Sequence, residues 1–184
     1  MPTPTRLEDM TLEQLWQLFP IILSPHKPEW ELCASAEIAL LTTLLSSHYP
    51  KISHIGSTAI KGIMAKPIID ILVEVADGSD WDSIKETLID SGYICMSQST
   101  ERMSFNKGYT IDGYAEKVFH IHIHKAGDND EIIFRDFLIT HPDIAKEYQS
   151  LKLSLLPQYR HNRDAYTNAK SLFINRVLAL SKTI

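Results

Sequence analysis

A run of eight mostly β-branched and apolar residues, Ile-Ile-Asp-Ile-Leu-Val-Glu-Val, occupies positions 68–75. Its apolar character on both faces predicts a central strand that is covered on each side. Asp70 interrupts the run, and an ionised carboxylate is costly there unless it is paired or coordinates a cation. Asp70 is therefore either structural, bonded to backbone N–H groups or a buried arginine, or part of a functional site.

The apolar spacing on either side of this strand predicts a mixture of strands and helices. We expect strands over residues 21–23, 52–55, 93–95, 102–107 and 117–124, a hairpin connection over 108–113, and helices over 12–19, 30–47, 80–91, 131–140, 142–156 and 164–182. The strands fall within about residues 20–125 and the last helices within about 130–184. We predict a single α/β domain (α+β in stricter terms) over 1–184: a mixed β-sheet flanked by helices, with a C-terminal helical cluster.

Charge and composition exclude several classes of partner. The net charge is −5 and the chain has no long basic run, so duplex DNA is not expected as a partner. No apolar run reaches the roughly 18–20 residues needed to span a bilayer, and no signal peptide opens the chain. Cys33 and Cys95 are far apart and are expected to be free thiols. These features predict a cytoplasmic protein without a membrane partner.

A polar segment between two predicted strands has the features of a phosphate site. Gly56, Ser57 and Thr58 follow the strand at 52–55, and Lys66 lies shortly before Asp70. Glycine lets a ligand approach the backbone closely, free N–H groups at such a turn can hold phosphate oxygens, and lysine adds positive charge. An ordinary turn is the alternative explanation for a Gly-Ser pair.

Three histidines alternate with isoleucines in the strand at 117–124. His120, His122 and His124 therefore share one face. This face is either exposed, bonded within a core, packed against a neighbouring strand or, if it adjoins Asp70, a source of metal ligands or of a general base. A histidine-triad hydrolase has a similar pattern, but apolar residues should then follow where Lys125 and Ala126 stand.

The helical half adds candidate phosphate ligands. Arg135 offers a guanidinium fork for a phosphate or, equally, for an ordinary ion pair with a carboxylate. Tyr166 and Lys170 lie four residues apart, which places the phenol and the ammonium on one helix face.

Several separated runs together resemble one known family. They read HIGSTAIKGIMAKPIIDILVEV, FHIHIH, FRDFLITHPDIAKEYQSLK and AYTNAKSLFI, and they extend from about Trp30 to Ile174. The chain resembles the GrpB-like family, predicted members of the nucleotidyltransferase superfamily. The resemblance implies a nucleotidyltransferase-like mixed sheet that binds a nucleotide, or another phosphorylated small molecule, and a divalent metal.

The resemblance also assigns roles to individual residues. Gly56 and Ser57 match the element that holds the nucleotide phosphates, and Asp70 matches the first carboxylate of an Asp-x-Asp pair that binds magnesium. Lys152, Tyr166 and Lys170 match motif positions that contact phosphates. With the candidates above, the expected phosphate-binding set is Gly56, Ser57, Thr58, Lys66, Arg135, Lys152, Tyr166 and Lys170.

The metal ligands depart from that pattern. Leu72 stands where the second carboxylate should be, Glu74 lies two steps farther along the same face, and the later strand offers imidazoles in place of a third carboxylate. Magnesium prefers oxygen ligands, whereas imidazole suits zinc, manganese or iron. The expected ligands of a divalent metal (magnesium or manganese, with zinc as an alternative) are Asp70, Glu74, His120 and His122, with Asp70 and His122 as catalytic residues.

Two functions remain open at this point. The first is transfer of a nucleoside monophosphate to an unknown acceptor. The second, which Leu72 favours, is a catalytically inactive module that keeps the fold to bind a nucleotide, a metabolite or a metal.

Overall fold

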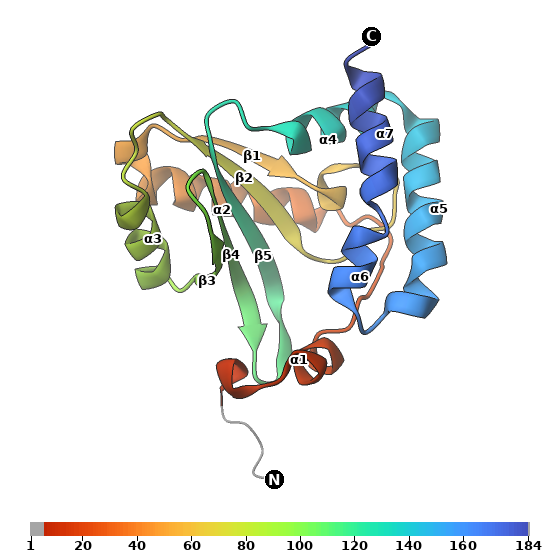
Figure 1. Ribbon diagram of the computed structural model, residues 1–184, viewed down its shortest axis with the longest axis horizontal. Coiled ribbons are helices and arrows are strands. Elements are labelled where there is room, and N and C mark those ends of the chain that lie inside the picture. The colour runs from red at the N-terminus through yellow and green to blue at the C-terminus, as the bar shows by residue number, and fades with distance from the viewer. Residues whose placement is uncertain (1–5, 184) are drawn as a thin grey trace.

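A five-stranded mixed sheet forms the centre of the protein (Figure 1). The structure, a computed structural model, describes residues 6–183. The strands are β1 (Lys51–Ile55), β2 (Ile69–Val75), β3 (Ile94–Gln98), β4 (Arg102–Thr110) and β5 (Gly113–Lys125), in the order β1-β2-β5-β4-β3. β2 pairs in parallel with β5, whereas the other neighbours are antiparallel. The prediction of a mixed sheet with the 68–75 run inside it is confirmed.

Helices cover both faces of the sheet. α2 (Glu29–Leu44) and α3 (Trp81–Asp90) pack on one face, where their apolar side chains form the main core with the isoleucines and valines of β2 and β5. The C-terminal helices α4 (Asp130–Thr140), α5 (Pro142–Tyr159), α6 (Arg163–Asn168) and α7 (Ser171–Ser181) lie together on one side of the molecule in Figure 1. Side chains of α4, α5 and α7 form a second core with Ile60 and Ile63. α1 (Leu12–Leu18) lies near the hairpin end of β4 and β5.

Side-chain caps explain where several of these helices begin. Thr11 accepts a hydrogen bond from the backbone N–H of Gln14, whose side chain bonds back to Thr11. Asp80 caps α3 and Asn162 caps α6 in the same general way. Such caps each contribute about 0.5–2 kcal/mol, because they satisfy N–H groups that have no partner within the helix.

Several expected elements and boundaries were wrong. Residues 21–23 form no strand, because the Ile21 N–H donates to the Arg160 carbonyl and not to the sheet. The helix expected over 164–182 is two helices, since the Lys170 N–H bonds to Thr167, three residues back, at a tightened turn. α5 continues through Pro157 to Tyr159, where the lost hydrogen bond falls in the last turn. The expected 108–113 connection is shorter, and β4 extends to Thr110.

Two further sequence expectations can be compared with the structure. Cys33 and Cys95 are free and half-buried. Within residues 6–183, no helix has both the length and the apolar character that crossing a bilayer would require.

Gly108 lies inside β4 because the two strands of the hairpin come very close there. Its φ is +90°, and a Cβ atom would lie 2.1 Å from the backbone oxygen of Lys117. A β-bulge between Lys107 and Tyr109 accompanies this conformation. The position therefore requires glycine for both its backbone angle and its lack of a side chain.

We predict that Gly108→Ala lowers the free energy of unfolding by about 2–5 kcal/mol, since a positive φ costs about 1–2 kcal/mol and overpacking a further 1–3. Gly78→Ala is the matched control, because Gly78 has a φ of +81° but open space around it. It should cost only the backbone penalty of about 1–2 kcal/mol. Urea denaturation of both variants measures the difference, and equal losses would contradict this account of the bulge.

Candidate functional site

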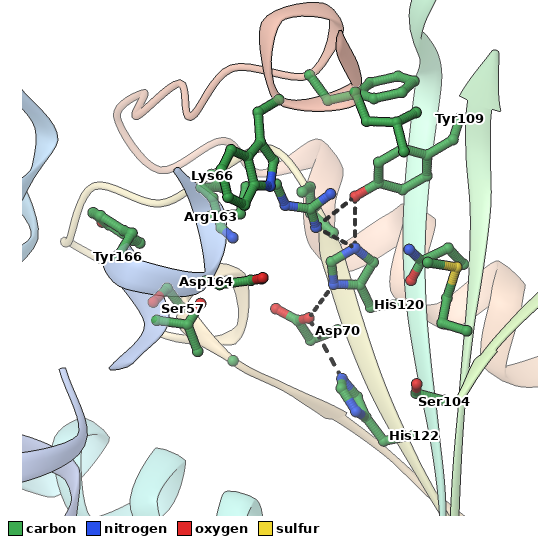
Figure 2. Close-up of a pocket in the computed structure, with 18 of the residues that line it drawn as sticks. Ser57, Lys66, Asp70, Ser104, Tyr109, His120, His122, Arg163, Asp164 and Tyr166 are labelled. Carbon is green, nitrogen blue, oxygen red and sulfur yellow. Dashed lines mark hydrogen bonds and ion pairs between the residues drawn. The ribbon is translucent and has the colours of Figure 1, made fainter. Parts of the chain in front are cut away.

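A pocket of about 670 Å³ opens on the sheet face opposite α2 and α3. β2, β3, β4 and β5 line it from the sheet, the Gly56-Ser57 turn from one side, and α1, α5 and α6 from the others (Figure 2). The pocket brings together most of the residues that the sequence singled out. Those that line it are Gly56, Ser57, Thr58, Lys66, Asp70, His120, His122, Lys152, Tyr166 and Lys170.

Asp70, His120 and His122 converge at the floor of this pocket. Asp70 Oδ1 lies 3.3 Å from Nδ1 of His120 and 3.7 Å from Nε2 of His122. The parallel register of β2 and β5 causes this meeting, because it sets Asp70 opposite His120 and Leu72 opposite His122. The histidine face therefore adjoins Asp70, so His120 and His122 are placed to act as metal ligands or as a general base.

The three side chains fit a divalent metal. One ligand atom from each residue lies within 4.8 Å of the other two. Metal–nitrogen and metal–oxygen bonds of about 2.0–2.2 Å separate neighbouring ligand atoms by about 3–3.5 Å, close to the distances from Asp70 to His120 and His122. Two imidazoles and one carboxylate make a donor set that suits manganese, iron or zinc better than magnesium.

A hydrogen-bond chain orients His120. Tyr109 Oη lies 2.7 Å from Nε2 of His120, and the Arg163 guanidinium donates to the same Tyr109 oxygen at 3.0 Å (Figure 2). Tyr109 therefore holds the far side of the imidazole, so that Nδ1 faces Asp70. An outer partner of this kind fixes ring orientation in metal sites.

Gly56 allows the Asp70 carboxylate to lie against the backbone turn. Its φ is +70°, and a Cβ atom there would lie 2.4 Å from Oδ2 of Asp70. The positive φ and the close Asp70 side chain together favour glycine at this position. Ser57, the next residue, accepts a hydrogen bond from Nζ of Lys152 at 3.0 Å.

Four cationic side chains line the pocket: Lys66, Lys152, Arg163 and Lys170. Burial, together with the charges of Lys170 and Lys66, lowers the pKa of Lys152 to about 7. Burial, Lys170 and Arg163 lower the pKa of Lys66 to about 8, and burial lowers the pKa of Lys170. These cations repel one another, so an anion bound among them would be strongly favoured.

Asp70 and Asp164, which also lines the pocket, only partly balance these charges. Burial raises the pKa of Asp70, but hydrogen bonds and charge attraction from His120 and His122 outweigh burial and hold it well below its usual range. Burial lowers the pKa of His120, against the opposing effect of Asp70. The floor of the pocket therefore carries an ionised carboxylate between two imidazoles.

A buried hydroxyl in the pocket wall lacks a partner. Tyr166 is 1% exposed, and its Oη has no hydrogen-bond partner among the residues that the structure describes. The ammonium of Lys170 lies 4.7 Å from the centre of its ring. A buried polar atom without a partner is costly, so a ligand that bonds to Tyr166 would recover that energy.

Three candidate residues lie outside the pocket. Glu74 accepts hydrogen bonds from the Gly127 N–H and from Asn129, so it holds the loop after β5. His124 is buried and its Nδ1 lies 2.9 Å from the Asp128 carbonyl. Arg135 donates to the His54 carbonyl and pairs with its neighbour Asp136. Glu74 and Arg135, which the sequence analysis placed in the site, therefore do not line this pocket.

Thr58 lines the pocket, but its hydroxyl is already engaged. It donates to the Ile68 carbonyl at 3.3 Å and lies 2.9 Å from Nε2 of His54.

Sequence reasoning missed Tyr109, Arg163 and Asp164. No sequence motif indicates Tyr109. Arg163 and Asp164 directly follow Asn162, whose side chain caps α6, so the sequence there predicts the start of a helix but not a binding site.

Comparison with known proteins identifies the family. A family model described as GrpB protein matches residues 20–180. This chain belongs to the GrpB family. The glutamate-rich protein GrpB of Alkalihalophilus pseudofirmus is 37% identical over 164 residues, which is 86% of this chain and 94% of that protein. A UPF0157 protein of Pseudomonas aeruginosa is 36% identical over 157 residues, which is 84% of this chain but only 64% of that protein.

Solved structures establish the fold class of this GrpB chain. The GrpB protein of Enterococcus faecalis superposes with a TM-score of 0.74 at 29% identity and covers 87% of this chain and 96% of that one. The MgGTP-bound Cid1 poly(U) polymerase superposes with a TM-score of 0.50 at 14% identity, over 77% of this chain and 44% of that one. The expected nucleotidyltransferase-like fold is confirmed.

The buried lysines predict how stability depends on pH. The pKa of Lys152 is about 7 in the folded protein and near its ordinary 10.5 in the unfolded chain. The unfolded chain therefore binds more protons between these values, so the free energy of unfolding should rise with pH. Lys152→Met should reduce this rise between pH 7.5 and 9 by up to about 1.4 kcal/mol per pH unit.

Urea denaturation at several pH values measures this slope. Lys146→Met is the control, because Lys146 is an exposed residue of the same helix α5. It should leave the slope unchanged. A Lys152→Met slope equal to that of the unmodified protein would show that Lys152 keeps an ordinary pKa in the fold.

Proposed function

We propose that this GrpB protein binds a nucleoside triphosphate with a divalent metal in the pocket and transfers the nucleoside monophosphate to an acceptor. One observation carries the proposal: a carboxylate between two imidazoles lies in the same cavity as four cationic side chains. A metal site beside a phosphate site is what transfer at a phosphorus atom needs.

The metal would be held by Asp70, His120 and His122. When bound, it would supply positive charge to the phosphate oxygens and to the departing pyrophosphate. Tyr109 and Arg163 keep His120 in place, and the lack of a side chain at Gly56 leaves room for Asp70. These residues prepare the site before any ligand arrives.

The phosphates would occupy the space between Ser57 and the cationic side chains. Lys152 is already fixed on Ser57 and on the Met64 carbonyl, so little conformational entropy is lost when a phosphate binds there. Lys66, Arg163 and Lys170 surround the same space, and the free Tyr166 hydroxyl can donate to an oxygen. An anion would relieve the mutual repulsion that lowers the lysine pKa values.

The chain supplies orientation and shelter for the reaction. The cationic wall would fix the phosphate chain on one side of Asp70, and aromatic and aliphatic side chains of α1 line the pocket. Holding the reactants in one geometry lowers the entropic part of the barrier, and a partly closed cavity strengthens the charge interactions.

Leu72 supports a second candidate function. It is fully buried and stands beside His122, so the second carboxylate of an Asp-x-Asp pair is absent from this floor. With fewer carboxylates, the same pocket would serve as a binding module for a nucleotide, a metabolite or a metal without turnover. The two functions share the ligand site and differ only in whether a product forms.

The first test concerns the metal. We expect the protein to bind one Mn²⁺ more tightly than Mg²⁺ in calorimetric titration, because imidazole nitrogen is a poor ligand for magnesium. Asp70→Asn and His122→Gln should each weaken Mn²⁺ binding by about 100-fold or more, beyond the 10–100-fold typical of an outer partner. His48→Gln, outside the pocket, is the control. An unchanged Mn²⁺ affinity in Asp70→Asn would show that Asp70 does not bind the metal and would contradict the proposed metal site.

The second test concerns the nucleotide. With Mn²⁺ present, calorimetry should detect ATP binding, and Lys170→Met should weaken it by about 10-fold or more, since a charge-assisted hydrogen bond contributes about 1.5–3 kcal/mol. Lys146→Met is again the control. An ATP affinity that does not change in Lys170→Met would place the nucleotide elsewhere.

A third test separates the enzyme from the binding module. The protein is incubated with Mn²⁺, ATP labelled at the α-phosphorus and a small-molecule extract of bacterial cells. Label that moves to a new compound and is lost with Asp70→Asn supports the transferase. ATP binding without any transfer of label supports the module.

A further inference from the structure

The pocket changes character from one end to the other. All four of its lysine and arginine side chains come from the segment before β2 and from the region of α5 to α7. Among the described lining residues, those from α1, β3 and β4 carry no charge. The metal-binding residues lie between these two ends. One cavity thus has a cationic end and an end, here called the neutral end, whose side chains from α1, β3 and β4 are uncharged. The two ends join at Asp70 and His120.

We propose that the neutral end is the acceptor subsite, and that it takes an uncharged small molecule with an apolar body and a hydroxyl group. This inference rests on the proposed function, since an acceptor is needed only if the nucleotide is used. It adds the chemical class of the second substrate, which neither the fold nor the family supplies.

The strand registers place the neutral end directly beside the metal ligands. Asp70 of β2 is opposite His120 of β5, His120 is opposite Asn106 of β4, and Asn106 is opposite Ile94 of β3. Neighbouring strands lie about 4.8 Å apart, so this row extends about 10 Å from His120 to Ile94. The row passes from carboxylate to imidazole, then to amide, then to hydrocarbon.

Hydrogen-bonding groups occupy the middle of this end. Asn106 and Ser104 both line the cavity from β4, and Ser104 is opposite His122 in the register. The Ser104 hydroxyl lies 2.6 Å from the Ser97 hydroxyl, which leaves its oxygen a further lone pair to accept with. With the Asn106 amide, it can hold an acceptor hydroxyl next to the metal ligands without adding charge. In Figure 2, Ser104 lies on the β4 side of His122, away from Ser57 and Tyr166.

The far part of the neutral end exposes apolar side chains. Ile94 is 45% exposed, Met96 57% and Leu12 51%, and all three line the same cavity. Ile94 and Met96 project from β3, while Leu12 comes from α1 across the opening. Exposed apolar side chains that gather in one hollow mark a binding surface, because a ligand there removes them from water.

Charge argues against an anionic or polymeric acceptor. Among the described lining residues outside the cationic end, the metal-binding part and α6, a single one is charged, the Glu8 carboxylate at the α1 side of the cavity. This negative charge would repel an anionic acceptor. A nucleic-acid acceptor would need cations along its backbone, and this end has none among the described lining residues. An uncharged molecule about 10 Å long matches the surface.

In the transfer that this arrangement allows, one bond to phosphorus forms and one breaks. The acceptor oxygen forms a bond to the α-phosphorus of the triphosphate, and the bond from that phosphorus to the pyrophosphate oxygen breaks. Pyrophosphate leaves with the electron pair, and the hydroxyl proton passes to water. The cationic end holds the departing pyrophosphate, opposite the side from which the acceptor approaches.

Benzyl alcohol is a suitable probe, because it combines a neutral apolar ring with a hydroxyl group. Saturation-transfer NMR on the whole protein should detect its binding. Ile94→Asp should weaken binding by about 5–10-fold, as expected for losing one apolar contact surface. Ile89→Asp is the matched control, because Ile89 is 46% exposed on α3 and does not line the cavity. Met96→Gln provides a second, milder variant.

Competition decides what the neutral end holds. Saturating ATP with Mg²⁺ should leave the benzyl alcohol affinity within about twofold, because separate sites act independently. Displacement by ATP would overturn the proposal, since the neutral end would then hold the nucleobase. Undetectable binding, or equal losses in Ile94→Asp and Ile89→Asp, would also overturn it.

Calorimetry with ATP on the same samples distinguishes the two proposals. ATP binding without benzyl alcohol binding overturns the acceptor subsite and leaves the nucleotide function standing. Benzyl alcohol binding without ATP binding overturns the nucleotide function, and the acceptor role falls with it.

Discussion

The parallel pairing of β2 with β5 is the interaction on which the rest of the site depends. It joins two segments that are 50 positions apart, and its register sets Asp70 opposite His120. A shift of one residue would turn every histidine to the opposite face, toward the main core. The isoleucines and valines that alternate with Asp70 and the histidines prevent this shift, because they are fully buried against α2 and α3. Core packing therefore fixes the geometry of the polar face.

Several side chains around the pocket on this polar face lower the stability of the fold. Four cationic side chains surround one cavity, and two of the lysines have pKa values of about 7 and 8 because burial and mutual repulsion disfavour their charged forms. Tyr166 buries a hydroxyl without a partner among the described residues. Such costs are common where a ligand supplies the missing charge or hydrogen bond. They have a single explanation if the cavity binds the phosphates of a nucleotide.

Local sequence patterns were enough to predict the class of the fold. The 68–75 run is an inner strand because its side chains are apolar on both faces, and the histidine strand follows from strict alternation. The joining of the two could not be predicted from local pattern, because pairing between distant strands depends on the whole core. For the same reason the contacts of Glu74 with Gly127 and of Arg135 with the His54 carbonyl could not be predicted, because these partners are distant in the chain. The family resemblance supplied Lys152, whose contact with Ser57 no spacing rule would predict.

The most direct test is the anomalous scattering of Mn²⁺ in crystals grown with a non-hydrolysable ATP analogue. The account predicts one anomalous peak bonded to Asp70, His120 and His122 at about 2.0–2.3 Å, with analogue phosphates extending toward Lys152 and Ser57. A Mn²⁺ peak elsewhere, or none, with Asp70 still bonded to the two imidazoles, would contradict it.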